Sequence, residues 1–134
     1  MAALKHEMVP IRSAADIVLA RQKVRAWTIE LKFSLVDQTK MVTAASELAR
    51  NTLDHGGGGT MTMEFAANGT RNGLRLTFED EGPGIPDIPQ ALRDGFSTGS
   101  GMGLGLSGSR RLVNEFEIAS NPGKGTRVVV TRWK

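Results

Sequence analysis

The feature that most constrains the fold is a pair of alternating segments joined by a turn, near the middle of the chain. Apolar and polar residues alternate in "TMTMEFA" and again in "LRLTFED", which is the period of a strand with one buried face. The connecting "ANGTRNG" is rich in the residues that tight turns require. The sequence therefore predicts a β-hairpin. The residues predicted to face inward are Met61, Met63, Phe65, Leu74, Leu76 and Phe78.

Two segments ahead of this hairpin have the periodicity of helices that would cover its buried face. "SAAD" at Ser13–Asp16 has the pattern of a capping box, and apolar residues then recur at helical spacing as far as Leu31. A second helix is predicted over Asp37–His55, and the four glycines at 56–59 end it.

Further elements are predicted towards both ends of the chain. The residues up to Ile11 predict an edge strand, where Pro10 is tolerated. The segment 82–105 is dominated by Gly, Pro and Ser, with a short helical stretch "PQALRDG" inside it. A third helix is predicted to start near 103–105, followed by the strands "EIASN" and "TRVVVTRW". That helix is predicted to carry Leu106, Leu112, Val113 and Phe116.

These elements predict an α+β fold. We expect a two-layer α/β sandwich, in which about three helices cover one face of a mixed, mainly antiparallel sheet. A length of 134 residues is enough for one domain with its own core, so residues 1–134 are predicted to form a single domain.

Composition excludes several classes of function. The chain has no cysteine, which rules out disulfides, thiolate metal sites and a cysteine nucleophile. No apolar run of signal-peptide or membrane-spanning kind is present, so we expect a soluble, cytoplasmic protein with no membrane partner. The net charge is +3, but the basic residues are scattered, and this disfavours nucleic acid as a partner.

The second predicted helix carries a group of polar residues close to its end. Glu47 and Asn51 are four residues apart, so their side chains lie one above the other on one face. Asp54 falls near the same line, with Arg50 and His55 on either side. A solvated helix face is one interpretation of this pattern, and the edge of a functional site is the other.

A second candidate segment is "FEDEGPGIPD", where the predicted strand runs into Asp80. A carboxylate at a strand end accepts hydrogen bonds, and Gly82 and Gly84 would let a flat ring approach the backbone. A strand that ends in an ordinary turn is the alternative interpretation.

A third candidate segment is "GFSTGSGMGLGLSGSRRL", with alternating glycines directly ahead of the third helix. Open backbone N–H groups at a helix start are suited to binding anions. The motif is neither a P-loop nor a Rossmann fingerprint. Flexible loops also contain alternating glycines, so this motif is weak when taken alone.

In this order the segments resemble the four conserved boxes of the GHKL ATPase superfamily, which includes gyrase, Hsp90-type, histidine-kinase catalytic and MutL-like domains. "ELARN" is similar to its N box, "DEGPGI" to its first glycine box, "GMGLGL" to its second, and "GKGT", ending at Thr126, to its last. Within the superfamily the chain looks most like the RsbT-type serine/threonine switch kinases of bacterial stress signalling. "ASELARN", "EDEGPGIPDI" and "DGFSTGSGMGLGL" carry that similarity.

The resemblance implies that Mg-ATP binds against the sheet, with the adenine at the first glycine box. Asp80 would accept a hydrogen bond from the adenine amino group. Gly82 and Gly84 would allow the ring to come close, and Thr126 would help through a water.

The same resemblance implies roles at the phosphate end. Asn51 would hold Mg²⁺ through its side-chain oxygen, and Gly101, Gly103 and Gly105 would wrap the phosphates. Glu47 would be the catalytic base that orients or deprotonates the attacking hydroxyl.

The resemblance also implies partners. As a kinase the chain would phosphorylate a STAS-domain anti-anti-sigma or stressosome protein, and a PP2C-type phosphatase or a sigma factor would be a further partner. The alternative is an anti-sigma factor that sequesters a sigma subunit in its ATP-bound form. The catalytic half of a sensor histidine kinase is disfavoured, because no helix with an acceptor histidine precedes the N box.

Overall fold

The predicted hairpin forms the centre of the sheet in the computed structural model, which describes residues 5–84, 106–121 and 123–134. Its strands are β2 (Gly59–Asn68) and β3 (Arg71–Asp80). They pair antiparallel in a register that sets the inward residues opposite one another, for example Met63 opposite Leu76. The period-two pattern therefore predicted both the strands and the face that each one buries.

Three more strands complete the sheet: β1 (His6–Ile11), β4 (Glu115–Asn121) and β5 (Gly125–Trp133). The order is β1-β2-β3-β5-β4, which places β1 at an edge, as predicted. All four pairings between the described strands are antiparallel, so the parallel pair that a mixed sheet would contain is not found among them.

Helix α1 (Ala14–Glu30) begins at the predicted capping signal. The Ser13 hydroxyl oxygen accepts a hydrogen bond from the backbone N–H of Asp16 at 3.4 Å. The Asp16 carboxylate in turn accepts from the backbone N–H of Arg12 at 2.9 Å. The first contact satisfies an N–H group that the first turn of a helix leaves unpaired, and the second fixes the residue just before the cap.

Helix α2 (Leu35–Asp54) starts two residues before the predicted Asp37. The cause is a second cap that the periodicity did not show: the Ser34 hydroxyl accepts from the backbone N–H of Asp37 at 3.1 Å. The far end is as predicted, with His55 as the C-cap.

The prediction for the third helix was wrong in its extent. Helix α4 covers Leu106–Arg111 only, so Leu112, Val113 and Phe116 are not on it. Phe116 belongs to β4 and pairs with Val130, and this extends β4 two residues ahead of the predicted "EIASN". The spacing of Phe116 is compatible with either a helix or a strand, and its pairing with β5 makes it part of a strand. The predicted start of the helix and the stretch "PQALRDG" lie outside the described residues.

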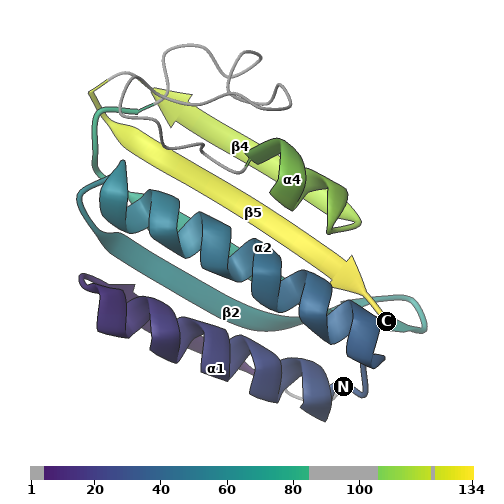
Figure 1. Ribbon diagram of the computed structural model, residues 1–134. Helices are drawn as coiled ribbons and strands as arrows, with labels where there is room; N and C mark the ends of the chain where they lie inside the picture. The colour runs from purple at the N-terminus through teal and green to yellow at the C-terminus, as the bar shows by residue number, and fades with distance from the viewer. Residues whose placement is uncertain (1–4, 85–105, 122) are drawn as a thin grey trace.

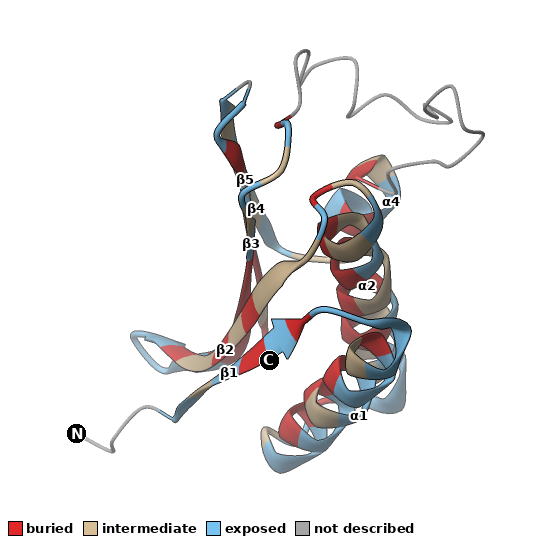
Figure 2. Cartoon of the chain, turned by 90° about the vertical axis from the view of Figure 1, so that its left-hand side faces the viewer, coloured by how far each residue is buried: buried red, intermediate tan, exposed pale blue. Residues whose placement is uncertain are grey.

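The helices cover one face of the sheet (Figure 1), with α1 and α2 side by side. Buried residues line the contact between the two layers (Figure 2). They come from both helices and from the inward positions of the strands, and include Val24, Ala45, Leu48, Met61 and Leu76. The prediction of an α+β two-layer fold is confirmed. None of the helices in the described part of the chain is long and apolar enough to cross a membrane.

Candidate active site

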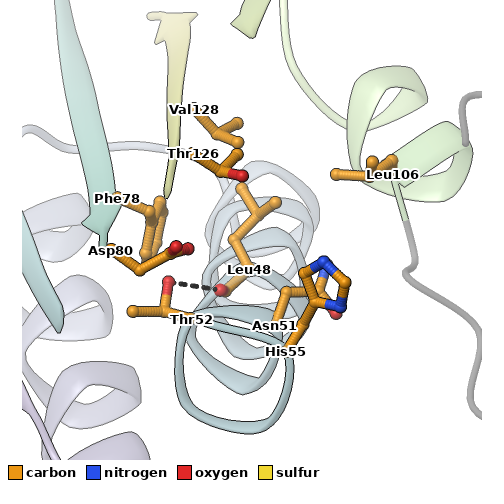
Figure 3. Close-up of a pocket in the computed structure, with 9 residues that line it drawn as sticks. All are labelled: Leu48, Asn51, Thr52, His55, Phe78, Asp80, Leu106, Thr126 and Val128. Atoms are coloured by element: carbon orange, nitrogen blue, oxygen red, sulfur yellow. Dashed lines mark hydrogen bonds between the residues drawn. The ribbon is translucent and has the colours of Figure 1, made fainter. Parts of the chain in front are cut away.

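A small pocket lies between the C-terminal half of α2 and the adjoining ends of β3 and β5 (Figure 3). Three of the predicted site residues line it together: Asn51 from α2, Asp80 from β3 and Thr126 from β5. Asp80 and Thr126 are direct partners in the sheet, which explains how residues 46 positions apart come to share one wall. The other lining residues are Leu48, Thr52, His55, Phe78, Leu106 and Val128.

Most of the pocket wall is apolar and comes from separate elements. Leu48 from α2, Phe78 from β3, Val128 from β5 and Leu106 from α4 are all nearly fully buried. A small apolar pocket with a few polar groups at its edge is the usual form of a site for a flat organic ring. Phe78 was predicted to face inward and Leu106 to lie on the third helix, but no pocket between these elements was predicted.

The Asp80 carboxylate is held in a fixed orientation at the end of β3. Its Oδ1 accepts a hydrogen bond from the backbone N–H of Gly82 at 2.9 Å. Gly56 packs directly against it, since a Cβ on that residue would lie 2.3 Å from the Asp80 Cγ. An ionised carboxylate has more acceptor positions than one N–H uses, so Asp80 retains capacity for a donor from a ligand.

The backbone conformation and the close packing at Gly84 both require a glycine. Its φ of +79° disfavours other residues, and a Cβ would lie 2.4 Å from the carbonyl oxygen of Asn121. The predicted glycine is therefore required for the chain to pass the end of β4, whatever approaches it from the pocket.

Thr126 has the hydrogen-bonding arrangement of an acceptor. Its hydroxyl lies 2.9 Å from that of Ser120, and the Ser120 hydroxyl donates to the carbonyl of Gly125 at 3.1 Å. Because Ser120 has one hydroxyl hydrogen, Thr126 is the donor between the two hydroxyls. The Thr126 oxygen then has lone pairs left to accept a hydrogen bond from a water or a ligand.

Asn51 and Glu47 differ in their relation to the pocket. Asn51 lines it, whereas Glu47 lies one turn earlier on α2, is partly exposed, and is not among the lining residues. No cluster of three or more His, Cys, Asp or Glu suited to a metal ion occurs among the described residues. The donor set fits an ion held by one protein oxygen and otherwise by phosphate, a common arrangement for Mg²⁺ in nucleotide sites.

The unassigned residues at the end of α2 divide into two groups. Arg50 and Asp54 are exposed, as the solvated-face interpretation predicts. His55 is the helix C-cap but also lines the pocket, and its Nε2 lies 3.2 Å from the carbonyl oxygen of Gly84. Its position one turn after Asn51 was the sequence signal for this placement. The predicted phosphate-binding residues Gly101, Gly103 and Gly105 lie outside the described residues.

Comparison with known proteins assigns the family. Residues 36–134 match the family described as "Histidine kinase-, DNA gyrase B-, and HSP90-like ATPase". The chain is 46% identical over 125 residues to the serine/threonine-protein kinase RsbT of Bacillus subtilis, which covers 93% of this chain and 94% of that protein. It is 32% identical over 120 residues to an anti-sigma F factor of Thermoanaerobacter, covering 85% and 82% of the two chains.

Solved structures agree on the fold. A structure of the RsbU and RsbW domains of Rv1364c from Mycobacterium tuberculosis matches 99% of this chain and 33% of that longer chain, with a TM-score of 0.66 and 21% identity. The catalytic domain of the histidine kinase ThkA matches with a TM-score of 0.54 and 16% identity.

The chain therefore belongs to the GHKL ATPase family. Within that family it is a serine/threonine-protein kinase of the RsbT type, related to the anti-sigma factors of bacterial partner switching, as the sequence predicted.

Proposed function

We propose that this chain transfers the γ-phosphoryl group of Mg-ATP to a serine or threonine hydroxyl of a STAS-domain partner, in the cytoplasm of a bacterium. The observation that carries the proposal is the convergence of Asp80, Thr126 and Asn51 on one apolar pocket. The 46% identity to a serine/threonine-protein kinase over nearly the whole chain supports it.

Asp80 and Thr126 would recognise the adenine. The Asp80 carboxylate, oriented by Gly82, accepts from the 6-amino group, and the apolar walls cover the ring faces. Guanine has an oxygen at that position, which a carboxylate repels, so the same contact gives selectivity for ATP.

Asn51 would act at the phosphate end, one turn of α2 away from His55. Its amide oxygen would hold Mg²⁺, and the glycines 101, 103 and 105 would offer backbone N–H groups to the phosphates. When bound, Mg²⁺ would supply positive charge to the phosphate oxygens.

Glu47 would act as the base. It takes the proton of the partner's hydroxyl as that oxygen bonds to the γ-phosphorus, while the bond from this phosphorus to the β–γ bridging oxygen breaks and ADP leaves. The partial exposure of Glu47, outside the pocket that we assign to adenine, is suited to contact with a protein substrate.

The test is phosphoryl transfer to purified STAS-domain proteins. With Mg-ATP we expect one phosphoryl group per partner molecule, located on Ser or Thr by mass spectrometry, with equimolar ADP formed. Absence of phosphate on every STAS protein encoded in the same genome would contradict the proposal.

A second candidate function is sequestration of a sigma subunit, favoured by the 32% identity to an anti-sigma F factor. The two functions predict different partners in a pull-down from the native cells. ATP-dependent capture of a sigma factor would favour the second, and capture of a STAS protein or a PP2C-type phosphatase would favour the kinase.

A further inference from the structure

His55 makes a contact that the roles proposed above do not use. Its backbone is fixed as the C-cap of α2, with its N–H donating to the carbonyl of Asn51 at 3.0 Å. Its Nε2 lies 3.2 Å from the carbonyl oxygen of Gly84, just after β3. A carbonyl can only accept, so Nε2 carries the hydrogen and donates it.

The segment that receives this hydrogen bond is held from its other side by the sheet. The backbone N–H of Gly123 donates to the carbonyl of Pro83 at 2.7 Å, and Gly84 packs closely against Asn121. The residues from Gly82 to Gly84 thus run between the end of α2 and the turn that joins β4 to β5. His55 supplies the side-chain contact on the α2 side.

The same short segment orients Asp80, through the hydrogen bond from the backbone N–H of Gly82 to Oδ1. We propose that His55 is a positioning residue for the nucleotide site. By holding Gly84 to α2, it sets the distance between the helix that carries Asn51 and the turn that orients Asp80. This inference rests on the proposed function, because it assigns the adenine end of the site to that turn.

Two roles for an imidazole at this place give opposite expectations. If His55 acts through its hydrogen bond, then an amide N–H at similar reach replaces it and an apolar ring of similar size does not. If His55 acts only by packing, then the ring is the better replacement. Figure 3 shows the His55 side chain beside that of Asn51 at the pocket wall, where either role is sterically open.

The first experiment compares His55→Gln with His55→Phe, and uses His6→Phe as the control. His6 is the other of the two histidines, and it is exposed on β1. We expect His55→Phe to raise the Kd and the KM for ATP by about 3- to 10-fold, the effect of one lost hydrogen bond. Because only binding at the adenine end is lost, kcat should not change. The Kd for ATP of His55→Gln should stay within about twofold of the wild-type value. The Kd of His6→Phe should equal the wild-type value.

The outcomes separate this inference from the proposed function. ATP affinity in His55→Phe equal to the wild type, or a loss in His55→Gln as large as in His55→Phe, would overturn the positioning role. A wild-type chain that binds no ATP at all would instead overturn the proposed function.

A second measurement tests the contact without nucleotide or substitution. In nitrogen-15 spectra of the wild-type chain, we expect a hydrogen on His55 Nε2 that exchanges slowly with water, and no such slowly exchanging hydrogen on His6. A His55 that occupies the Nδ1–H tautomer would show that the hydrogen bond to Gly84 is absent, and would overturn the inference.

Discussion

The two ends of α2 use polar residues in different ways. At its start, the Asp37 carboxylate accepts a hydrogen bond from Arg132 Nη2 at 2.6 Å, and Arg132 Nη1 donates to the carbonyl of Leu112 at 3.0 Å. At its far end, Asn51 and His55 line a pocket between the helix and the ends of β3 and β5.

This difference separates the polar groups on α2 that stabilise the fold from those that are available to a ligand. Asp37 and Arg132 are mostly buried, with side-chain exposures of 29% and 15%, and each one meets an opposite charge within the protein. At the pocket end, the Asp80 carboxylate accepts a hydrogen bond from the backbone N–H of Gly82 and faces apolar walls. We therefore expect substitutions at the start of α2 to change the free energy of unfolding and leave ATP affinity unchanged. Substitutions at the pocket end should mainly change ATP affinity.

The largest effect is expected from Glu47→Gln, which keeps size and removes the base. Transfer to the partner should fall by about 10²- to 10⁴-fold, the usual contribution of a general base. ATP affinity should stay within a factor of about two, because Glu47 is outside the pocket. Single-turnover transfer and equilibrium nucleotide binding measure the two quantities separately.

Asn51→Ala is the matched variant one turn further along α2. It should weaken ATP binding in Mg²⁺ and have little effect in EDTA, since its proposed role is through the ion. If Glu47→Gln weakened binding as much as Asn51→Ala does, the separate roles of the two residues would be wrong.

Gly56→Ala should reduce ATP affinity by about 10- to 100-fold, the range for a lost hydrogen bond to a charged group. The new Cβ would lie 2.3 Å from the Asp80 Cγ and 2.5 Å from its Cβ, so the Asp80 side chain has to leave its observed position. Isothermal titration of the purified variant measures the effect.

Gly108→Ala on α4 is the control for this glycine, because a Cβ there meets nothing within 4 Å. It should leave ATP affinity unchanged and raise the free energy of unfolding by about 0.5 to 1 kcal/mol, because Ala favours a helix. Equal nucleotide affinities in the two glycine variants would show that Asp80 does not need its observed orientation.

The smallest effect on the site is expected at the other end of α2. Asp37→Ala should lower the free energy of unfolding by about 1 to 2 kcal/mol, because it leaves a mostly buried guanidinium without its carboxylate. Urea denaturation measures this, with exposed Asp54→Ala as the control on the same helix. ATP affinity per folded molecule should not change, and a tenfold loss would mean that the two ends are coupled.

Much of the fold followed from local patterns, and most errors were at ends of elements. The alternation in β2 and β3 predicted strands, turn and buried face together, because the strand period is short and the hairpin is local. The early start of α2 needed the Ser34 cap, and the position of Phe116 needed its partner Val130 on another strand. The ends of these elements depend on individual hydrogen bonds and strand pairings, which the hydrophobic periodicity does not show.

Three polar residues that line the pocket were candidate site residues in the sequence, whereas its apolar walls were not predicted. Asn51, Asp80 and Thr126 stand in recognisable motifs, and the structure brings them together. Val128 stands in no motif, and Leu106 only ends "GMGLGL", whose glycines were the predicted ligand-binding residues. An apolar residue that lines a pocket looks the same in a sequence as any other core residue. The contact between His55 and Gly84 joins residues 29 positions apart, so only the folded chain reveals it.

The central claim is that the pocket between α2 and β3 binds the adenine of ATP through Asp80. The most direct test measures the affinity of the wild-type chain and of Asp80→Asn for Mg-ATP and Mg-GTP by isothermal titration. We predict that the wild type prefers ATP, and that Asp80→Asn binds ATP about 10- to 100-fold more weakly with an unchanged free energy of unfolding. Equal affinity of the two proteins for ATP would contradict the claim.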